Sequence, residues 1–210
     1  MHFLTIGSLS CMAALALAAP TVSTTSNADL AERFTFEDYS GTSSADDKRE
    51  ITFEDYSGTL SNADKRSPDV LEARKSSHIS SCGDNWMPIK DTYSPAGSGY
   101  ESAVNAWCYH ITHPMDDTPS IIPPKGILGS RIAGGFFLKG HVPGVVDFEI
   151  HNKKSNGEHK PDEGNCKNYL MQMATKGNKC YGSKNIDTKG GTYQVEGDGE
   201  ISYHALPRAA

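Results

Sequence analysis

The sequence predicts an α+β domain in which an antiparallel sheet of about four strands is covered by two helices and joined by two disulfides, behind a disordered pro-region. Two observations lead to this fold class. The elements expected between residue 98 and the C-terminus follow the order α-β-β-α-β-β, which favours an antiparallel sheet with helices packed on it. Four cysteines remain after a hydrophobic leader, and an even number in an exported chain is typical of a disulfide framework.

The first element is a leader. Residues 1–19, MHFLTIGSLSCMAALALAA, have the short apolar run and the small terminal side chains of a signal peptide. Cleavage after Ala18 or Ala19 removes Cys11 with this segment. We therefore expect a secreted, extracellular protein. No apolar stretch of about 18 residues or more follows, so the sequence predicts no membrane-spanning helix.

Residues 20–66 form an acidic pro-region that contains an internal duplication. Residues 33–49 and 50–66 are identical at 12 of 17 aligned positions and share the core TFEDYSGT. Two copies are too few to build a solenoid. Each unit has few large apolar side chains and many acidic and small ones, so it cannot bury enough area to offset the entropy of the chain. We expect the pro-region to be disordered.

Each repeat ends in a dibasic pair, Lys48-Arg49 in the first copy and Lys65-Arg66 in the second. This arrangement resembles kexin processing in the fungal secretory pathway and implies a kexin-like protease as a partner. Cutting after Arg66 leaves residues 67–210, which hold 15 Lys and Arg against 16 Asp and Glu, a net charge of −1. The complete chain has a formal net charge of −6 and no excess of cations for phosphate, so it has no signature of nucleic-acid binding.

The repeats also permit a second interpretation. Short repeated cores between dibasic sites are similar to the fungal precursors of ribosomally made cyclic peptides. The core TFEDYSGT offers a Phe and a Tyr for side-chain crosslinking. Against this interpretation, such precursors usually carry more copies and no large cysteine-containing domain.

The chain after the pro-region divides into a linker over residues 67–81 and a globular domain over residues 82–206. The domain contains two predicted helices. Residues 98–111 place apolar side chains at helical spacing, with Ser98 as the N-cap. Residues 162–176 begin with acidic side chains and are followed by a glycine, which is the usual asymmetry of a helix.

Two predicted hairpins complete the sheet. Residues 130–139 and 144–152 have the composition of strands, and HVPG between them suits a hairpin turn. Residues 190–206 read as the second hairpin, with Asp198-Gly199 as a type I′ turn.

Four cysteines belong to the domain: Cys82, Cys108, Cys166 and Cys180. Three connectivities are open. We prefer the local bridge Cys166–Cys180, which leaves Cys82–Cys108, and each bridge can contribute about 2–4 kcal/mol of stability. No CxxC pair is present and the export route favours oxidation, so we expect no metal and no cofactor.

A signal peptide, a dibasic pro-region and a four-cysteine domain together resemble fungal small secreted effector proteins. The patterns CGDNW, WCYHI, NCKNYL, CYGS and GGTY, over residues 82–205, are similar in style to fungal necrosis-inducing and killer-toxin-like domains. The resemblance implies a small disulfide-bonded α/β sandwich that acts on an extracellular target, a protein or a glycan. No functional residue carries over from it.

One strand carries candidate acid–base residues. Three polar residues alternate onto one side of the second predicted strand: Asp147, Glu149 and His151. A sheet face that carries an acid and a histidine resembles the active sites of secreted ribonucleases, which need a general base, a general acid and a cation. Three residues around the predicted hairpin can supply the rest: Arg131, Lys139 and His141. Alternation alone also predicts a plain polar, solvent-facing side of the strand, and we favour that interpretation.

The functional expectation is therefore a non-enzymatic secreted effector or toxin-like protein, released by dibasic processing, that acts on a host or a competitor. The alternatives are a small ribonuclease-like hydrolase and a precursor of a repeat-derived peptide. Convergence of Glu149, His151 and another histidine in a cleft would favour the hydrolase, whereas isolated, solvated histidines would favour the effector.

Overall fold

The computed structural model describes residues 26–42, 77–91, 98–114, 120–195 and 200–210, and the structural statements below concern these residues. The predicted signal peptide and both Lys-Arg pairs lie outside them.

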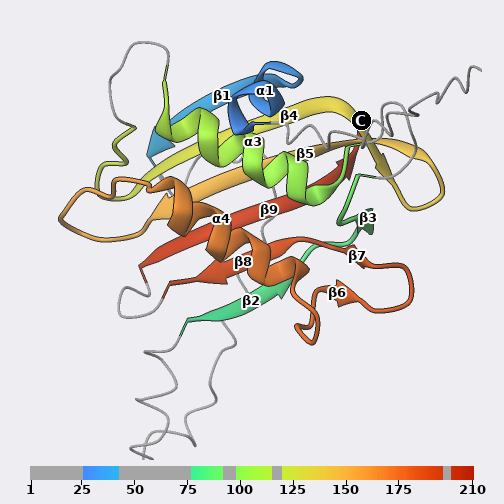
Figure 1. The fold of residues 1–210 in the computed structure, drawn as a ribbon. Helices are drawn as coiled ribbons and strands as arrows, with labels where there is room; N and C mark the ends of the chain where they lie inside the picture. The colour runs from blue at the N-terminus through green and yellow to red at the C-terminus, as the bar shows by residue number, and fades with distance from the viewer. Residues whose placement is uncertain (1–25, 43–76, 92–97, 115–119, 196–199) are drawn as a thin grey trace, which may run out of the picture.

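The main sheet has six antiparallel strands in the order β1-β4-β5-β9-β8-β2 (Figure 1). Its strands are β1 (Thr35–Thr42), β2 (His78–Cys82), β4 (Gly126–Leu138), β5 (Val142–Asn152), β8 (Gly191–Gln194) and β9 (Ile201–Ala209). A second sheet has three strands of two residues each: β3 (Met87–Pro88), β6 (Tyr181–Gly182) and β7 (Asp187–Thr188). The α+β class is confirmed, but the main sheet has six strands rather than four.

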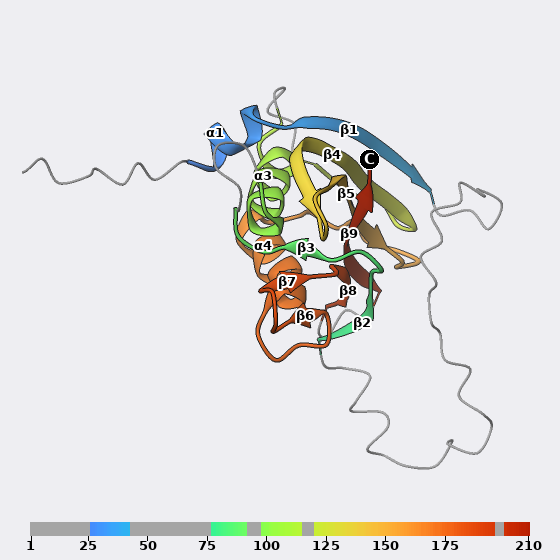
Figure 2. The same cartoon turned by 90° about the vertical axis from the view of Figure 1, so that its right-hand side faces the viewer.

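The helices lie on one face of this sheet. Figure 2 shows α3 (Tyr100–Thr112) and α4 (Glu163–Met171) beside each other there, with the strands running from β1 at the top to β2 at the bottom. A short 3-10 helix, η1 (Gln172–Ala174), continues α4, and α1 (Asn27–Glu32) packs near α3. None of the helices in the described parts of the chain is long and apolar enough to cross a membrane.

The helix ends agree with the sequence in one case and differ in the other. Asp162 caps α4, because its side chain accepts a hydrogen bond from the backbone N–H of Asn165. The predicted cap Ser98 is wrong, since the N-cap of α3 is Gly99. Ser98 instead forms an isolated bridge with Phe136 of β4, which draws its side chain into the interior.

The expectation of a disordered pro-region is wrong for residues 27–42. The first copy of TFEDYSGT is strand β1, which pairs with β4 from Thr35↔Ala133 to Thr42↔Gly126. The argument for disorder considered only the area that a repeat can bury within itself. An edge strand instead takes its hydrogen bonds and its buried area from a sheet that already exists.

The predicted linker also ends earlier than expected. Strand β2 starts at His78, four residues before the expected start of the domain, and pairs with β8. These two additions, β1 and β2, are the outer strands of the sheet and account for the difference between four strands and six.

The turn between β4 and β5 overlaps the predicted HVPG only at His141, because β5 already starts at Val142. Lys139, Gly140 and His141 make it, with positive φ at Gly140 (83°) and His141 (62°). Two positive φ values in succession turn the chain tightly enough for Val142 to pair with Leu138. In the C-terminal hairpin Tyr193 pairs with Tyr203, as the alternation indicates, and Asp198-Gly199 lies outside the described residues.

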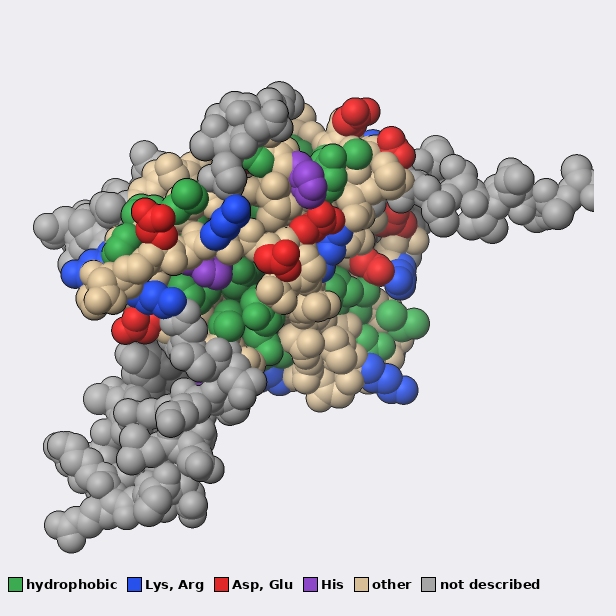
Figure 3. Space-filling model, turned by 60° about the vertical axis from the view of Figure 1, so that its left-hand side comes forward, with side chains coloured by type: hydrophobic (Ala, Val, Ile, Leu, Met, Phe, Trp, Pro, Cys, Tyr) green, Lys and Arg blue, Asp and Glu red, His purple; other side chains and the backbone are tan. Residues whose placement is uncertain are grey.

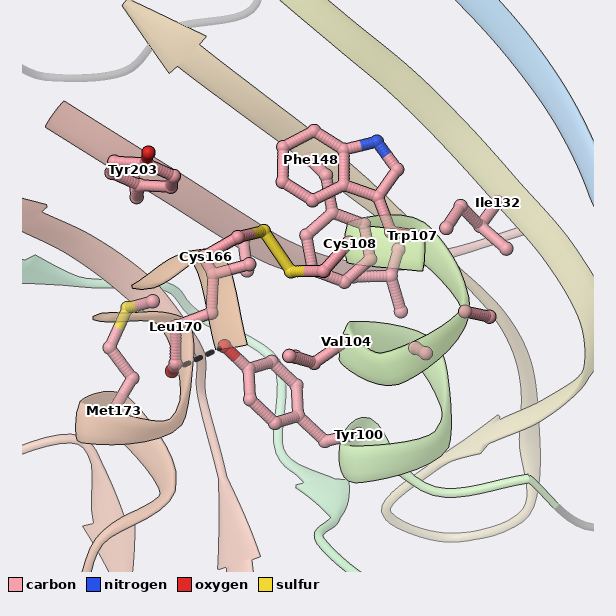
Figure 4. Packing of buried hydrophobic residues seen from close by; sticks show 14 of the residues in the cluster. Tyr100, Val104, Trp107, Cys108, Ile132, Phe148, Cys166, Leu170, Met173 and Tyr203 are labelled. Carbon is pink, nitrogen blue, oxygen red and sulfur yellow. Dashed lines mark hydrogen bonds between the residues drawn. A yellow bond between two sulfur atoms is a disulfide. The ribbon is translucent and has the colours of Figure 1, made fainter. Parts of the chain in front are cut away.

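The apolar core fills the space between the helices and the sheet (Figure 4). Trp107 of α3 stacks on Phe148 of β5 with 4.8 Å between ring centroids, and both side chains are fully buried. The hydroxyl of Tyr100 donates to the carbonyl of Leu170 at 3.1 Å, which ties α3 to α4. The core therefore holds each helix both to the sheet and to the other helix.

The preferred disulfide pairing is wrong. The bridges are Cys82–Cys180 and Cys108–Cys166. Helices α3 and α4 lie side by side on the sheet, so Cys108 meets Cys166 although 58 residues separate them (Figure 4). Cys180 is local to Cys166 in sequence but meets the end of β2 instead, because chain proximity does not decide which secondary elements pack together.

Candidate acid–base site

The candidate site lies on the face of β5 that points away from the helices. Val146, Phe148 and Ile150 lie in the core, so the residues between them belong to the other face. That face was expected to be open to solvent, but Asp147 is only 1% exposed and Glu149 only 4%. Side chains from the neighbouring strands close over it, and the contacts described next are the reason for the burial.

Glu149 is held between two partners. Its Oε2 lies 2.5 Å from Nε2 of His151, and its Oε1 accepts a hydrogen bond from the hydroxyl of Tyr39 at 2.7 Å. Tyr39 belongs to β1, two strands away, and its ring reaches Glu149 across Gly129 of β4. A Cβ atom at Gly129 would lie 2.6 Å from that ring, so only glycine leaves room for it.

Burial sets the state of Tyr39. Removal from water raises the pKa of the Tyr39 hydroxyl, and the charge of the Glu149 carboxylate raises it further. The phenol therefore stays protonated at neutral pH and remains a hydrogen-bond donor to Glu149.

A second histidine packs against His151. The ring centroids of His151 and His204 are 4.2 Å apart. His204 is 1% exposed, and hydroxyls lie near both ring nitrogens: Thr192 Oγ1 at 2.9 Å from Nδ1, and Ser202 Oγ at 2.8 Å from Nε2. Burial lowers the pKa of His204 well below its ordinary value, and the nearby charges of His151 and Lys153 lower it further. His204 is therefore neutral at pH 7 and positions the ring of His151.

Two arginines meet the remaining carboxylate. Asp147 accepts two hydrogen bonds from Arg131, at 2.8 and 3.2 Å, and lies 3.0 Å from Nε of Arg208. One carboxylate between two guanidinium groups leaves a net charge of +1 on the three side chains. Asp147 is buried, but the side chains of Arg131 and Arg208 are 46% and 32% exposed, so the positive charge reaches the surface. Glu37 of β1 lies across from Arg131 and partly balances it.

The structure therefore brings together four of the residues named from the sequence: Arg131, Asp147, Glu149 and His151. It does not bring His141 or Lys139 to them, because both lie exposed in the turn between β4 and β5. Sequence reasoning missed three members of the cluster: Tyr39, His204 and Arg208. Tyr39 lies in the repeat, and the two others are placed by the pairing of β9 with β5, which no local pattern reveals.

Two further histidines, His110 and His113, lie at the end of α3 beside acidic side chains of other elements. His110 lies 2.8 Å from Asp38 of β1, and His113 lies 3.8 Å from Glu163 of α4. Within the described residues, no three His, Cys, Asp or Glu side chains are grouped so as to hold a metal ion.

Charge is mixed on the face of the molecule that Figure 3 shows. Figure 3 shows a side of the molecule on which acidic and basic side chains lie interspersed, with hydrophobic side chains between them.

Comparison with protein-family models, with curated proteins and with solved structures found no match for this chain.

Proposed function

We propose that this protein is a secreted, ribonuclease-like hydrolase that uses Glu149 as general base and His151 as general acid. The observation that carries the proposal is the 2.5 Å contact between Glu149 Oε2 and His151 Nε2 beside a cationic group of two arginines. A carboxyl group and an imidazole in contact supply the two kinds of side chain that act most often as general base and general acid. The convergence of Glu149, His151 and His204 supports the hydrolase, and departure of Tyr39 from Glu149 would open this face to a substrate.

The spacing of the pair suits a phosphodiester. The Cα atoms of residues two apart on one face of a strand are separated by roughly 6.6 Å, so once the 2.5 Å contact between Glu149 and His151 opens, their side chains can reach opposite sides of one phosphate. Glu149 takes the proton of a ribose 2′-hydroxyl while that oxygen forms a bond to phosphorus. The bond from phosphorus to the 5′-oxygen breaks, and His151 gives that oxygen a proton. The products are a 2′,3′-cyclic phosphate and a free 5′-hydroxyl.

The arginines supply the cation for this step. Arg131 and Arg208 carry a partly exposed net positive charge beside the pair, and such groups stabilise the charge that develops on the phosphoryl oxygens. The net negative charge of the chain argues against a protein that binds a long nucleic acid through many phosphates. It does not oppose contact with a single phosphodiester, and removal of residues 1–66 brings the net charge from −6 to −1.

Tyr39 occupies the position that the substrate would take. Its hydroxyl donates to Oε1 of Glu149, which is the contact that a ribose 2′-hydroxyl would make. We therefore expect activity to appear when the repeat segment leaves the edge of β4. Dibasic cleavage in the secretory pathway removes the covalent link to the repeat segment, and loss of that segment after export fits a toxin-like effector that acts on a host or a competitor through this activity.

The test is cleavage of a short oligoribonucleotide by the exported protein after treatment with a kexin-like protease and separation of the repeat fragments. RNA should be cut with 2′,3′-cyclic phosphate ends, and the matching oligodeoxyribonucleotide should not. Glu149→Gln and His151→Asn should each lower the rate by about 10²-fold or more.

Matched controls come from the same chain. Glu101→Gln alters a carboxylate that pairs with Lys90, and His141→Asn alters a histidine in the exposed turn, where asparagine tolerates the positive φ. Both should retain full activity. Absence of RNA cleavage, or equal cleavage by all variants, would overturn the proposal.

A further inference from the structure

The first copy of the repeat is a strand of the main sheet. We propose that the edge of β4 is a binding site for the sequence TFEDYSGT and that either copy of the repeat can fill it. Residues 35–42 occupy the site as β1, and residues 52–59 have the same eight amino acids. The proposal concerns binding and holds whether or not the protein is a hydrolase.

The helix side of the site recognises two side chains of the segment. Phe36 stacks on the ring of His110 with 4.0 Å between centroids. Asp38 accepts a hydrogen bond from the hydroxyl of Ser130 at 2.6 Å and lies 2.8 Å from Nε2 of His110. These contacts are specific for an aromatic residue followed two positions later by an acid. The second copy offers the same pair as Phe53 and Asp55.

The opposite side of the site recognises the residues between them. The ring of Tyr39 lies over Gly129 and its hydroxyl donates to Glu149, while Glu37 lies across from Arg131. The second copy again supplies the same types, as Glu54 and Tyr56. Backbone pairing gives affinity in strand addition, and side-chain seats on alternating faces give specificity. Here side chains on both faces of the segment make specific contacts.

The differences between the copies fall where the site tolerates them. Phe34 is buried and stacks on Phe136 at 4.9 Å, and the second copy has an apolar residue, Ile51, at this position. Arg33 is exposed and is replaced by Glu50. An exposed change of charge has little effect on packing, so the second copy retains what the site uses.

The connecting chain is long enough for the exchange. Eighteen residues, 60–77, separate the second copy from β2. They can span roughly 60 Å when extended, whereas five strand spacings across the sheet amount to roughly 24 Å. The second copy can therefore reach the edge of β4 in the same direction as the first.

Dibasic cleavage would then produce two competing ligands for one site. Fragments 20–49 and 50–66 each carry one TFEDYSGT segment. One fragment should stay bound to the edge of β4 without a covalent link, and the other should leave.

The first experiment uses the full uncleaved chain and hydrogen exchange of the β4 amides. The backbone N–H groups of adjacent residues in an edge strand point alternately to the neighbouring strand and to solvent. Replacement of both Asp38 and Tyr39 by proline therefore removes one hydrogen bond between this segment and β4. Asp55→Pro with Tyr56→Pro is the matched change in the second copy. Protection of the amides of residues 126–133 that face β1 should persist in each of these variants and be lost only when both copies carry the prolines, whereas the amides that face β5 should stay protected throughout.

The opposite pattern overturns the proposal. If the change in the first copy alone removes protection as fully as the combined change, the site accepts only β1. The same conclusion follows if the change in the first copy alone prevents folding of the chain while the change in the second copy does not.

The second experiment uses the protein cut at both dibasic sites and native mass spectrometry. One repeat fragment per domain should remain bound, and excess synthetic peptide of residues 50–66 should replace it, whereas a scrambled peptide should not. Gly129→Ala places a Cβ 2.6 Å from the Tyr39 ring and 2.8 Å from the carbonyl oxygen of Phe148, and it should release both fragments. Unchanged hydrogen exchange of the β9 amides then shows that the rest of the sheet is intact. Gly164→Ala, where a Cβ meets only an ordinary contact at 3.4 Å, is the control and should release neither. Loss of both fragments from the unaltered protein, or retention of both, contradicts a single site.

Discussion

Strand β5 presents two buried faces that are held together by different forces. Toward the helices it has Val146, Phe148 and Ile150, which are all fully buried. On the other side Asp147 and Glu149 are almost as inaccessible. The first face is buried because apolar area leaves water, and any well-fitting apolar neighbour would serve. The second is buried only because each carboxylate has particular partners.

The two faces differ in how strictly they require particular neighbouring side chains. Burial of an ionised carboxylate is unfavourable unless charged or hydrogen-bonding groups surround it. The partners of Glu149 and Asp147 come from β1, β4 and β9, so several strands are arranged around this one face. Stability alone would be served by an apolar face, which is why we associate the polar face with function.

The largest expected effect breaks the apolar face. Ile150→Ala should lower the free energy of unfolding by about 2–5 kcal/mol, because it leaves a cavity in a fully buried position. Ile121→Ala is the matched control, since that side chain is 52% exposed, and it should change stability by less than about 0.5 kcal/mol. Urea unfolding measures both. Equal effects of the two changes would show that the core does not lie where we place it.

A smaller effect concerns protonation on the polar face. The pKa of His204 is lower in the folded protein than its ordinary value of 6.5, so below about pH 6.5 the unfolded chain binds a proton that the folded chain does not. Its contribution to stability is complete above pH 6.5 and is lost as the pH falls, by at most about 1.4 kcal/mol per pH unit.

His204→Gln should reduce this acid slope. The slope is measured from urea unfolding between pH 4.5 and 7.5, and it is compared with that of His113→Gln, which alters a half-exposed histidine on α3. An unchanged slope in His204→Gln would show that the ring is protonated in the folded state.

The last pair of changes tests whether a buried hydroxyl needs a hydrogen-bond partner. Ser130 accepts from Trp107 Nε1 at 2.9 Å and donates to Asp38, so Ser130→Ala should lower the free energy of unfolding by about 1–3 kcal/mol. Within the described residues, Ser98 Oγ is buried with no hydrogen-bond partner. Ser98→Ala should therefore leave stability unchanged or raise it. Thermal unfolding distinguishes the two, and similar losses would contradict the rule here.

The sequence predicts the parts of the fold that depend on local patterns. Helix α3, helix α4 and the central strands β4 and β5 follow from spacing, capping and alternation within each segment. The same alternation places Asp147, Glu149 and His151 on one face. These properties are decided by neighbours a few residues away, so they are visible in the chain.

The remaining features depend on contacts between distant segments. The outer strands β1 and β2, the two disulfides, and the positions of Tyr39 and His204 all follow from which strands pair and in which register. The first copy of the repeat lacks the apolar content of an independent unit, and it forms a strand by pairing with the edge of β4. A pattern within the repeat cannot reveal a partner about 90 residues away.

The two arginines on Asp147 have a consequence for assembly of the sheet. One comes from the strand before β5 in the sheet and the other from the strand after it, and both lie opposite or beside the same carboxylate. A slip of either neighbour by one residue would turn its guanidinium to the helix face and leave Asp147 short of a counter-charge. A single acidic side chain thus penalises misalignment of three strands at once, and so selects one alignment during folding.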